Sequence, residues 1–321
     1  MSGVPAAPGP GALRANAHPV LPASSVVGPT LAPVDGAPAL VLRGPSRNSP
    51  AALLVADLHL GLAATPERPL GPPGGSAEEI WRRLVDLART ARARTIVIAG
   101  DVKHPIVGTP PALRPILFDF FAELLREGFG AEVVLGNHDG GLVRHLPREV
   151  VVHPATGAVR GSVGIFHGHR WPSPDVQSCR QWVTGHLHPG YRFAPTADHP
   201  DGKQPCWVRA EFVRRGSAAR RRGLLAELIV LPPFHPLAGL EALNRDRPAR
   251  GRSFLYRRFL ASSTARAYLL DGTDLGVIPT WAGPADGSGS APGGPPGRSP
   301  EGRTSFPRRR APGRRPKDRS G

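Results

Sequence analysis

The chain has 321 residues, among them 39 glycines, 39 prolines and two cysteines, and its formal net charge is +16. No run of about 20 apolar residues is present, so we expect no membrane-spanning helix, and two cysteines do not make a disulfide framework. The first residues show no basic region followed by an apolar segment, so no signal peptide is expected. These features favour a cytoplasmic protein with reduced thiols.

The two ends of the chain differ in composition from its middle. Residues 1–37 are dominated by Ala, Pro, Gly and Val, and residues 283–321 consist almost wholly of Gly, Pro, Ser and Arg. Neither segment carries enough large apolar side chains to offset the entropy lost when a chain becomes ordered. We therefore expect one globular domain over residues 38–282 between two disordered ends.

The first half of this domain alternates apolar strands with amphipathic helices. Ser76 and Glu79 form a capping-box signature that opens a helix reaching about Ala93, and a second helix carries apolar residues from Leu113 to Leu124. Such alternation indicates βαβ units and a parallel sheet, whose functional crevice lies at the carboxyl ends of its strands. Strands are expected at 39–42, from Leu53, at 95–99 and at 132–135, the first two joined as a hairpin.

The second half has shorter predicted strands joined by turns, which is typical of a second, more antiparallel sheet. The last two strands flank an arginine-rich insert that contains Arg214, Arg215 and residues 220–222. Strands are expected at 150–153, 158–160, 162–166, 181–184, 206–213 and 224–231, with a short helix at 175–179 and late core elements at 231–234 and 268–271.

Basic residues gather in this insert and near the end of the chain. Residues 296–321 hold nine Lys and Arg residues against Glu301 and Asp318. Basic blocks attract polyanions such as nucleic acid, so we expect nucleic acid as a partner of the insert and the tail. The alternative is a solvated tail that only adds solubility.

Candidate metal ligands follow five of the predicted strands. Asp57 and His59 are two residues apart, so on an extended strand they project to the same side. Neither cysteine lies at a strand end, which argues against a structural zinc site. Mixed carboxylate, amide and imidazole ligands suit Mn²⁺, Fe or Zn²⁺ rather than Ca²⁺, and two ions sharing a carboxylate would use them all. The groups are Asp57/His59, Asp101, Asn137/His138/Asp139, His167/His169 and His186/His188.

This ordered set of motifs, Asp-x-His, Gly-Asp, Gly-Asn-His-Asp, His-Gly and Gly-His-x-His, resembles the calcineurin-like metallophosphoesterase superfamily over residues 57–188. The resemblance implies an α+β fold, a four-layer α-β-β-α sandwich of two mixed sheets, that holds two divalent metal ions. Lys103-His104 after Gly-Asp, Pro189 and residues 231–234 are similar to the ICC-like phosphoesterases, which include the DNA-ligase-associated repair phosphoesterase. The protein Ser/Thr phosphatase branch fits less well, because no Asp and Arg follow Gly-Asp here.

The resemblance also implies a role for each ligand. Of the two candidates His167 and His169, His167 is favoured as a ligand because it comes first after its strand, and His169 would then contact substrate phosphate. The first metal would be held by Asp57, His59 and His188, the second by Asn137, His167 and His186, and both by a bridging Asp101. Manganese is favoured, with iron or zinc as alternatives.

The implied catalytic residues are His138 and Asp139. His138 would be the general acid that protonates the leaving oxygen, held in place by Asp139. His104 either reaches the site or is a solvated loop histidine, and His235 is interpreted as a surface or core histidine.

The predicted activity is metal-assisted hydrolysis of a phosphate ester. The basic clusters favour phosphodiesters of nucleic acid or nucleotides, in keeping with a role in DNA repair, although few aromatic residues lie between the basic ones to stack on bases. The alternatives are a small-molecule phosphomonoesterase and a non-catalytic scaffold that keeps the fold and binds nucleic acid.

Overall fold

A computed structural model describes residues 30–44, 49–62, 75–195, 197, 201–213, 225–244, 255 and 265–278. The predicted C-terminal tail, residues 1–29 of the predicted N-terminal segment and the arginine-rich insert lie outside the described residues. Within those ranges, no helix is long and apolar enough to cross a bilayer.

The first sheet has six strands in the spatial order β1-β2-β3-β4-β5-β6. The pairs β1–β2 and β2–β3 are antiparallel, whereas the strands from β3 to β6 run parallel to one another. Parallel neighbours need crossover connections, and α1 and α2 provide two of them, so the predicted βαβ units are confirmed. The strands are Thr30–Pro33, Leu40–Arg43, Ala51–Val55, Ala93–Ile98, Gly130–Val134 and Val151–His153.

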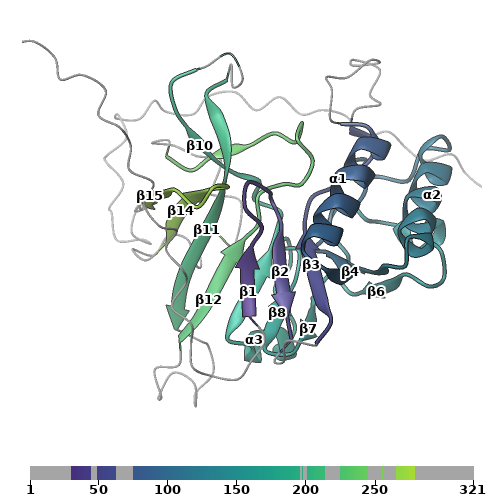
Figure 1. Cartoon of the computed structure of the whole chain (residues 1–321), viewed down its shortest axis with the longest axis horizontal. Coiled ribbons are helices and arrows are strands. Elements are labelled where there is room, and N and C mark those ends of the chain that lie inside the picture. The colour runs from purple at the N-terminus through teal and green to yellow at the C-terminus, as the bar shows by residue number, and fades with distance from the viewer. Residues whose placement is uncertain are drawn as a thin grey trace, which may run out of the picture. The chain divides into compact units, whose positions relative to one another are not determined.

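Helices α1 (Ala77–Thr90) and α2 (Leu113–Arg126) lie next to each other against the first sheet (Figure 1). The predicted capping box is present, since the Ser76 hydroxyl accepts the Glu79 N–H and the Glu79 carboxylate accepts the Ser76 N–H. Helix α1 ends before the predicted Ala93. Its end is fixed by Arg92, whose φ of +53° is incompatible with a continuing right-handed helix.

The second sheet has nine strands, seven of them in the order β13-β10-β11-β12-β9-β8-β7, with β14 beside β11 and β15 beside β14. It is mixed, because β9 is parallel to both β8 and β12 while β11 is antiparallel to β10, β12 and β14. Its strands are Ala158–Arg160, Val163–Ile165, Gln181–Thr184, Pro189–Arg192, Lys203–Val213, Leu225–Val230, Glu241–Ala242, Arg266–Leu269 and Asp274–Val277.

The two sheets pack face to face, as the burial of β3 shows. Leu53 and Val55 point into the cluster shared with α1 and α2, while Ala52 and Leu54 point into a cluster that contains Ile165 and other residues of the second sheet. Both faces of β3 are therefore buried, which explains its uninterrupted apolar sequence. The short helix α3 (Pro174–Ser178) packs on the outer side of the second sheet. The predicted α+β sandwich of two mixed sheets is confirmed.

Several strands depart from the sequence expectation: β10, β13 and β15 were not predicted, and β1 and β6 were assigned wrongly. β1 lies within segment 1–37, which was predicted to be disordered, but Thr30–Pro33 pairs with β2 and Leu31 is buried between the sheets. A single large apolar residue in this stretch gave no sequence signal, because the strand is stabilised by pairing with its neighbour. β6 was grouped with the second sheet, yet it pairs with β5 and forms an edge of the first. A 3-10 helix, η2 (Leu142–His145), precedes it.

Candidate metal centre

Among the described residues, six non-glycine residues have a left-handed backbone, and five of them are predicted metal ligands. L-residues other than glycine rarely adopt this conformation, which costs roughly 1–3 kcal/mol each and tends to persist at functional sites. The φ angles are +59° at Asp57, +42° at His59, +53° at Asp101, +72° at His186 and +43° at His188. Asp57 and His59 thus converge through this turned backbone after β3, and not through the strand alternation that the sequence suggested.

The first group of side chains consists of Asp57, His59 and His188, which come from the ends of β3 and β9. His188 Nε2 lies 3.1 Å from His59 Nε2 and 3.3 Å from Asp57 Oδ1. Metal–ligand bonds of about 2.0–2.2 Å place neighbouring ligand atoms roughly 3 Å apart, so these spacings fit one shared ion. The Nδ1 atom of His188 donates to the Gly239 carbonyl at 3.0 Å, which directs Nε2 inward.

The second group consists of Asp101, His167 and His186, with Asn137 beside it. His167 Nε2 lies 3.3 Å from Asp101 Oδ2 and 3.2 Å from Asn137 Oδ1. Its Nδ1 donates to the Ala99 carbonyl at 2.8 Å, which again leaves Nε2 for the site. The donor set of imidazole, carboxylate and amide fits a second divalent ion.

Asp101 lies between the two groups. Its Oδ2 atom is 3.3 Å from His167 Nε2 in the second group and 3.9 Å from His59 Nε2 in the first. The His169 ring centroid is 5.4 Å from that of His167, and His169 belongs to neither group. Of the two candidate ligands, His167 is therefore the one whose Nε2 atom lies beside Asp101 and Asn137.

Two glycines allow the backbone to approach these carboxylates closely. A Cβ atom on Gly136 would lie 2.2 Å from Asp101 Oδ1, and one on Gly185 would lie 2.5 Å from Asp57 Oδ2. Both distances are shorter than any tolerated contact, so only glycine fits. The glycines that precede Asn137 and His186 are thus part of the construction of the site.

Both carboxylates are almost fully shielded from water, with Asp57 at 0% and Asp101 at 2% exposure. Burial by itself would raise the pKa of each. The neighbouring His188 reverses this for Asp57, and His167 reverses it for Asp101, so the pKa of each carboxyl lies below its usual value. Both groups are therefore ionised at neutral pH, and the buried negative charge suits a cation.

The histidines divide into two classes. Burial lowers the pKa of His59 to about 3 and of His186 to about 4, so these rings are neutral and ready to bind metal at pH 7. Burial also acts to lower the pKa of His167, but the hydrogen bond and charge of Asp101 outweigh it and raise that pKa to about 9. A cation that binds His167 must displace this proton.

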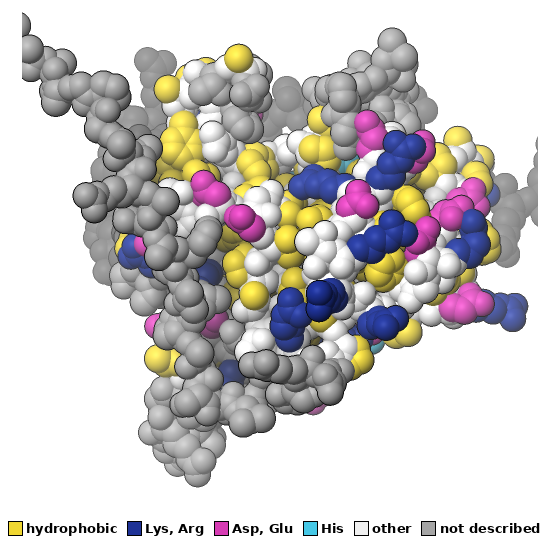
Figure 2. Space-filling view, viewed as in Figure 1, with side chains coloured by type: hydrophobic (Ala, Val, Ile, Leu, Met, Phe, Trp, Pro, Cys, Tyr) yellow, Lys and Arg dark blue, Asp and Glu magenta, His cyan; other side chains and the backbone are white. Residues whose placement is uncertain are grey.

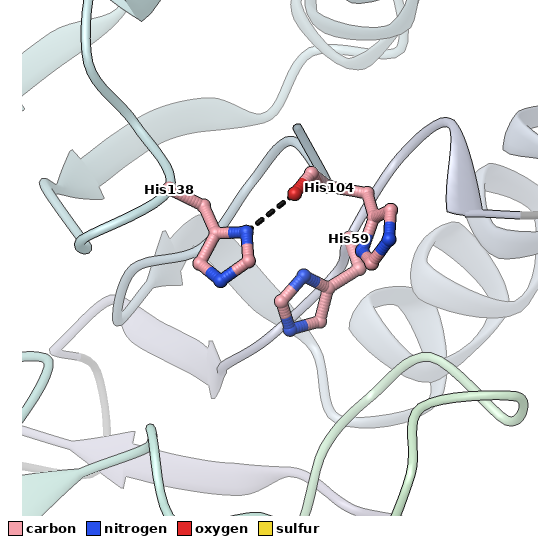
Figure 3. A group of neighbouring side chains, drawn as sticks. All are labelled: His59, His104 and His138. Atoms are coloured by element: carbon pink, nitrogen blue, oxygen red, sulfur yellow. Dashed lines mark hydrogen bonds between the residues drawn. The ribbon is translucent and has the colours of Figure 1, made fainter. Parts of the chain in front are cut away.

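His138 lies at the edge of the centre with 16% of its side chain exposed. Its backbone N–H donates to Asp101 Oδ1 at 2.9 Å, and its ring Nδ1 donates to the His104 carbonyl oxygen (Figure 3). The Nε2 atom lies 3.6 Å from Asp101 Oδ2. The His59 and His138 rings meet edge to face at 4.9 Å. His138 thus presents Nε2 next to both groups of ligands.

The structure corrects the expected contact between Asp139 and His138. The Asp139 carboxylate accepts three backbone N–H groups instead, from Val102 at 2.9 Å, Lys103 at 3.3 Å and Gly136 at 2.8 Å. Burial raises the pKa of Asp139, and the Gly136 and Lys103 N–H groups oppose this rise. Asp139 therefore joins the loops after β4 and β5, and the His104 carbonyl takes the position next to the His138 ring that Asp139 was expected to hold.

His104 itself reaches the site. Its ring lies 5.4 Å from that of His59, and it forms a third cluster of nitrogen atoms with His59 and His138. Burial lowers its pKa. Of the two interpretations that the sequence left open, the structure supports the one in which His104 borders the centre.

Solved structures similar to this chain include a nuclease and a phosphoesterase. The nuclease MPE of Pseudomonas putida has a TM-score of 0.47 and 20% sequence identity, over 75% of this chain and 98% of its own. YfcE, a phosphoesterase from E. coli, has a TM-score of 0.33 and 17% identity, over 71% of this chain and 99% of its own. No family model and no curated protein matches the sequence.

The segment at residues 231–235 contributes to the site in a way that sequence reasoning missed. Phe234 N–H donates to the Ala56 carbonyl at 2.9 Å and His235 N–H to the Asp57 carbonyl at 3.2 Å. Arg83 of α1 lies 4.7 Å over the Phe234 ring and donates to the Phe234 carbonyl at 3.2 Å. His235 is buried, so it is a core histidine as one interpretation expected, but the segment also fixes the backbone of a predicted ligand.

Proposed function

We propose that this protein is a member of the calcineurin-like metallophosphoesterases, a metal-dependent hydrolase that cleaves phosphate esters at a two-metal centre. The observation that carries the proposal is the convergence of the predicted ligands. Side chains spread over residues 57–188 meet in two groups with Asp101 between them. The strained backbone at five of them and the ionised, buried carboxylates support the same conclusion.

In this proposal each metal has its own set of ligands. Asp101 would contribute to both sites, because its carboxylate offers two oxygen atoms. Asp57, His59 and His188 would hold the first ion, and Asn137, His167 and His186 would hold the second. When bound, two divalent cations would supply Lewis acidity toward the phosphoryl oxygens and the attacking water. We propose manganese at both sites, with iron or zinc as alternatives.

The chain itself supplies the proton for the leaving group. The His138 ring has its Nδ1 hydrogen bonded to the His104 carbonyl. The proton given to the substrate is therefore the second one, carried on Nε2 by the doubly protonated ring. The His138 backbone N–H donates to Asp101 Oδ1, which holds the proposed acid beside the carboxylate proposed to be shared by both metal sites. We assign His138 as the general acid that protonates the departing oxygen.

The test is hydrolysis of bis-p-nitrophenyl phosphate by the full chain loaded with Mn²⁺. We expect release of nitrophenolate above the metal-only blank, two metal ions per chain by elemental analysis, and loss of both activity and about one ion in the Asp101→Asn variant. A metal-loaded, folded protein with no release above the blank would overturn the proposal.

We further propose phosphodiesters of nucleic acid or nucleotides as the substrate class, with a role in DNA repair in the cytoplasm. The net charge of +16 supports this choice of substrate. The compartment is proposed because two cysteines do not make the disulfide framework of a secreted protein. On the face shown in Figure 2, basic and acidic side chains are interspersed, and Arg82 and Arg89 of α1 pair with Glu78 and Glu127. We therefore assign nucleic-acid attraction to the arginine-rich insert and the C-terminal tail.

Salt dependence tests this assignment. Binding of single-stranded DNA should weaken steeply as salt rises, because each neutralised phosphate releases counterions, and removal of residues 283–321 should flatten the slope. A salt-independent affinity, or turnover of phosphomonoesters alone in a substrate screen, would contradict it.

A further inference from the structure

Lys103 has no exposed surface, although it carries a long cationic side chain. Its ammonium group donates to two carbonyl oxygens of its own loop, those of Pro105 and Gly108, the latter at 2.9 Å. Burying a lysine is costly unless its charge has partners. The loop at residues 103–108, which we call the lysine loop, therefore closes around its own ammonium group.

This loop contains the carbonyl oxygen that accepts a hydrogen bond from the His138 ring. The His104 carbonyl, one residue after Lys103, accepts the hydrogen bond from His138 Nδ1 (Figure 3). A carbonyl oxygen can only accept, so a neutral His138 ring has its hydrogen on Nδ1, and Nε2 is the atom that takes up the second proton, the one given to the leaving oxygen. The direction of this one carbonyl thus sets both the tautomer and the orientation of the ring.

The lysine loop is also fastened at its start. The Lys103 N–H and the Val102 N–H donate to Asp139 Oδ1, and Lys103 pairs with Leu60 in an isolated parallel bridge. The His104 N–H also donates to the Leu60 carbonyl at 3.0 Å. The rest of the loop is exposed, with Ile106 at 59% and Val107 at 91%. The packing of these exposed residues cannot hold residues 105–108, so the part of the loop that follows the His104 carbonyl depends on the two hydrogen bonds from the ammonium group.

We propose that Lys103 is a positioning residue, which folds the lysine loop so that the His104 carbonyl faces His138 Nδ1 and directs Nε2 into the centre. The effect of Lys103 on catalysis rests on the function proposed above. The effect of Lys103 on the orientation of the His138 ring does not depend on that function. The competing role is purely electrostatic, in which Lys103 only balances the charges of Asp101 and Asp139.

The first test reads the ring directly. In the full chain loaded with Zn²⁺, which is diamagnetic, ¹⁵N-histidine spectra at a pH where the His138 ring is neutral should show its hydrogen on Nδ1, with the signal assigned by its loss in His138→Ala. The isosteric Lys103→Met variant should lose this single tautomer while it retains both metals. An unchanged His138 signal in folded Lys103→Met would overturn the proposal.

A milder variant keeps the test decisive if Lys103→Met does not fold. Gly108 has a φ of +67° and open space around its Cβ position, so Gly108→Ala strains the loop backbone at one of the two acceptors and leaves the lysine charge in place. Gly128→Ala is the matched control, since Gly128 has a φ of +84°, equally open space and a position after α2. We expect the His138 signal to shift in Gly108→Ala and to stay as in the wild type in Gly128→Ala. A His138 signal that does not differ between the two variants would contradict the proposal and favour the electrostatic role.

Kinetics then separate positioning from general destabilisation. Lys103→Met should slow hydrolysis of an ester with a poor leaving group by about tenfold or more, within the roughly 10²–10⁴-fold expected for loss of the acid itself, with kcat affected more than KM. In the His138→Ala background the same substitution should cost less than about twofold. Equal costs in both backgrounds would overturn the proposal. If the wild type hydrolyses no ester, the proposed function fails, and the ¹⁵N spectra still decide the role of Lys103.

Discussion

At the scale of single residues, the site is built from side chains whose backbone is unfavourable. Five predicted ligands have φ angles between +42° and +72°, and this strain is stabilised by backbone hydrogen bonds such as Asp57 N–H to the Gly100 carbonyl at 3.0 Å and His59 N–H to the Asp101 carbonyl at 2.9 Å. The ends of β3 and β4 therefore hold each other in the strained conformation.

His138 gives the first prediction at this scale. His138→Ala should lower kcat by about 10²–10⁴-fold, because a proposed general acid is lost, while two metal ions remain bound. The measurements are steady-state kinetics and metal content. His145→Ala, at the end of η2, is the matched control and should leave the rate unchanged. Loss of metal in His138→Ala would instead make His138 a ligand.

Gly185 gives the second prediction at the scale of single residues. Gly185→Ala should displace the Asp57 carboxylate, since the new Cβ would lie 2.5 Å from its Oδ2 atom, and metal content should fall by about one ion per chain. Gly130→Ala is the control, because a Cβ there meets its nearest atom at 3.4 Å. Full metal content in both variants would show that Asp57 is not a ligand or can move freely.

At the scale of elements, helix α1 supports the proposed metal centre through a residue of its own, Arg83. Its start is fixed by Ser76 and Glu79, and its Arg83 stacks on Phe234 of the segment that bonds to the Ala56 and Asp57 backbone. Burial lowers the pKa of Arg83, but an arginine remains charged at any physiological pH. The helix thus contributes to the site through a cation–π contact rather than through a ligand.

The cap of α1 can be tested by itself. Ser76→Ala should lower the free energy of unfolding by about 1 kcal/mol, because the Glu79 N–H loses its acceptor at the start of the helix. Ser76→Thr keeps a hydroxyl and should cost less. Chemical denaturation measures both, and equal stability of all three proteins would show that the capping box contributes nothing.

At the scale of the whole described domain, an ionic cluster joins the two sheets at one edge. Glu132 of β5 and His153 of β6 belong to the first sheet, and Arg160 of β7 belongs to the second. Burial acts to raise the pKa of Glu132, but hydrogen bonds from Arg160 and His153 outweigh it and lower that pKa. A carboxyl with a depressed pKa contributes stability that is present above its unfolded pKa and lost as pH falls through the folded one.

Glu132→Gln should therefore destabilise the domain at pH 7 by about 1 kcal/mol, and the difference from wild type should shrink as pH falls below about 4. Glu123→Gln removes an exposed pair with Arg126 and should have little effect at any pH. Denaturation curves over this pH range provide the comparison. A constant difference at all pH values would mean that the charge of Glu132 is not what stabilises the junction.

The sequence by itself determined the alternation of strands and helices in the first half of the domain, the capping box and the set of candidate ligands, because these depend on local periodicity, turn residues and donor chemistry. It also placed His167 ahead of His169. Only the tertiary structure decided that β1 joins the first sheet, that Asp139 binds three backbone N–H groups, and that the His104 carbonyl faces His138. Each of these depends on partners distant in the chain, which meet only after the sheets have paired and stacked, so no local pattern could specify them.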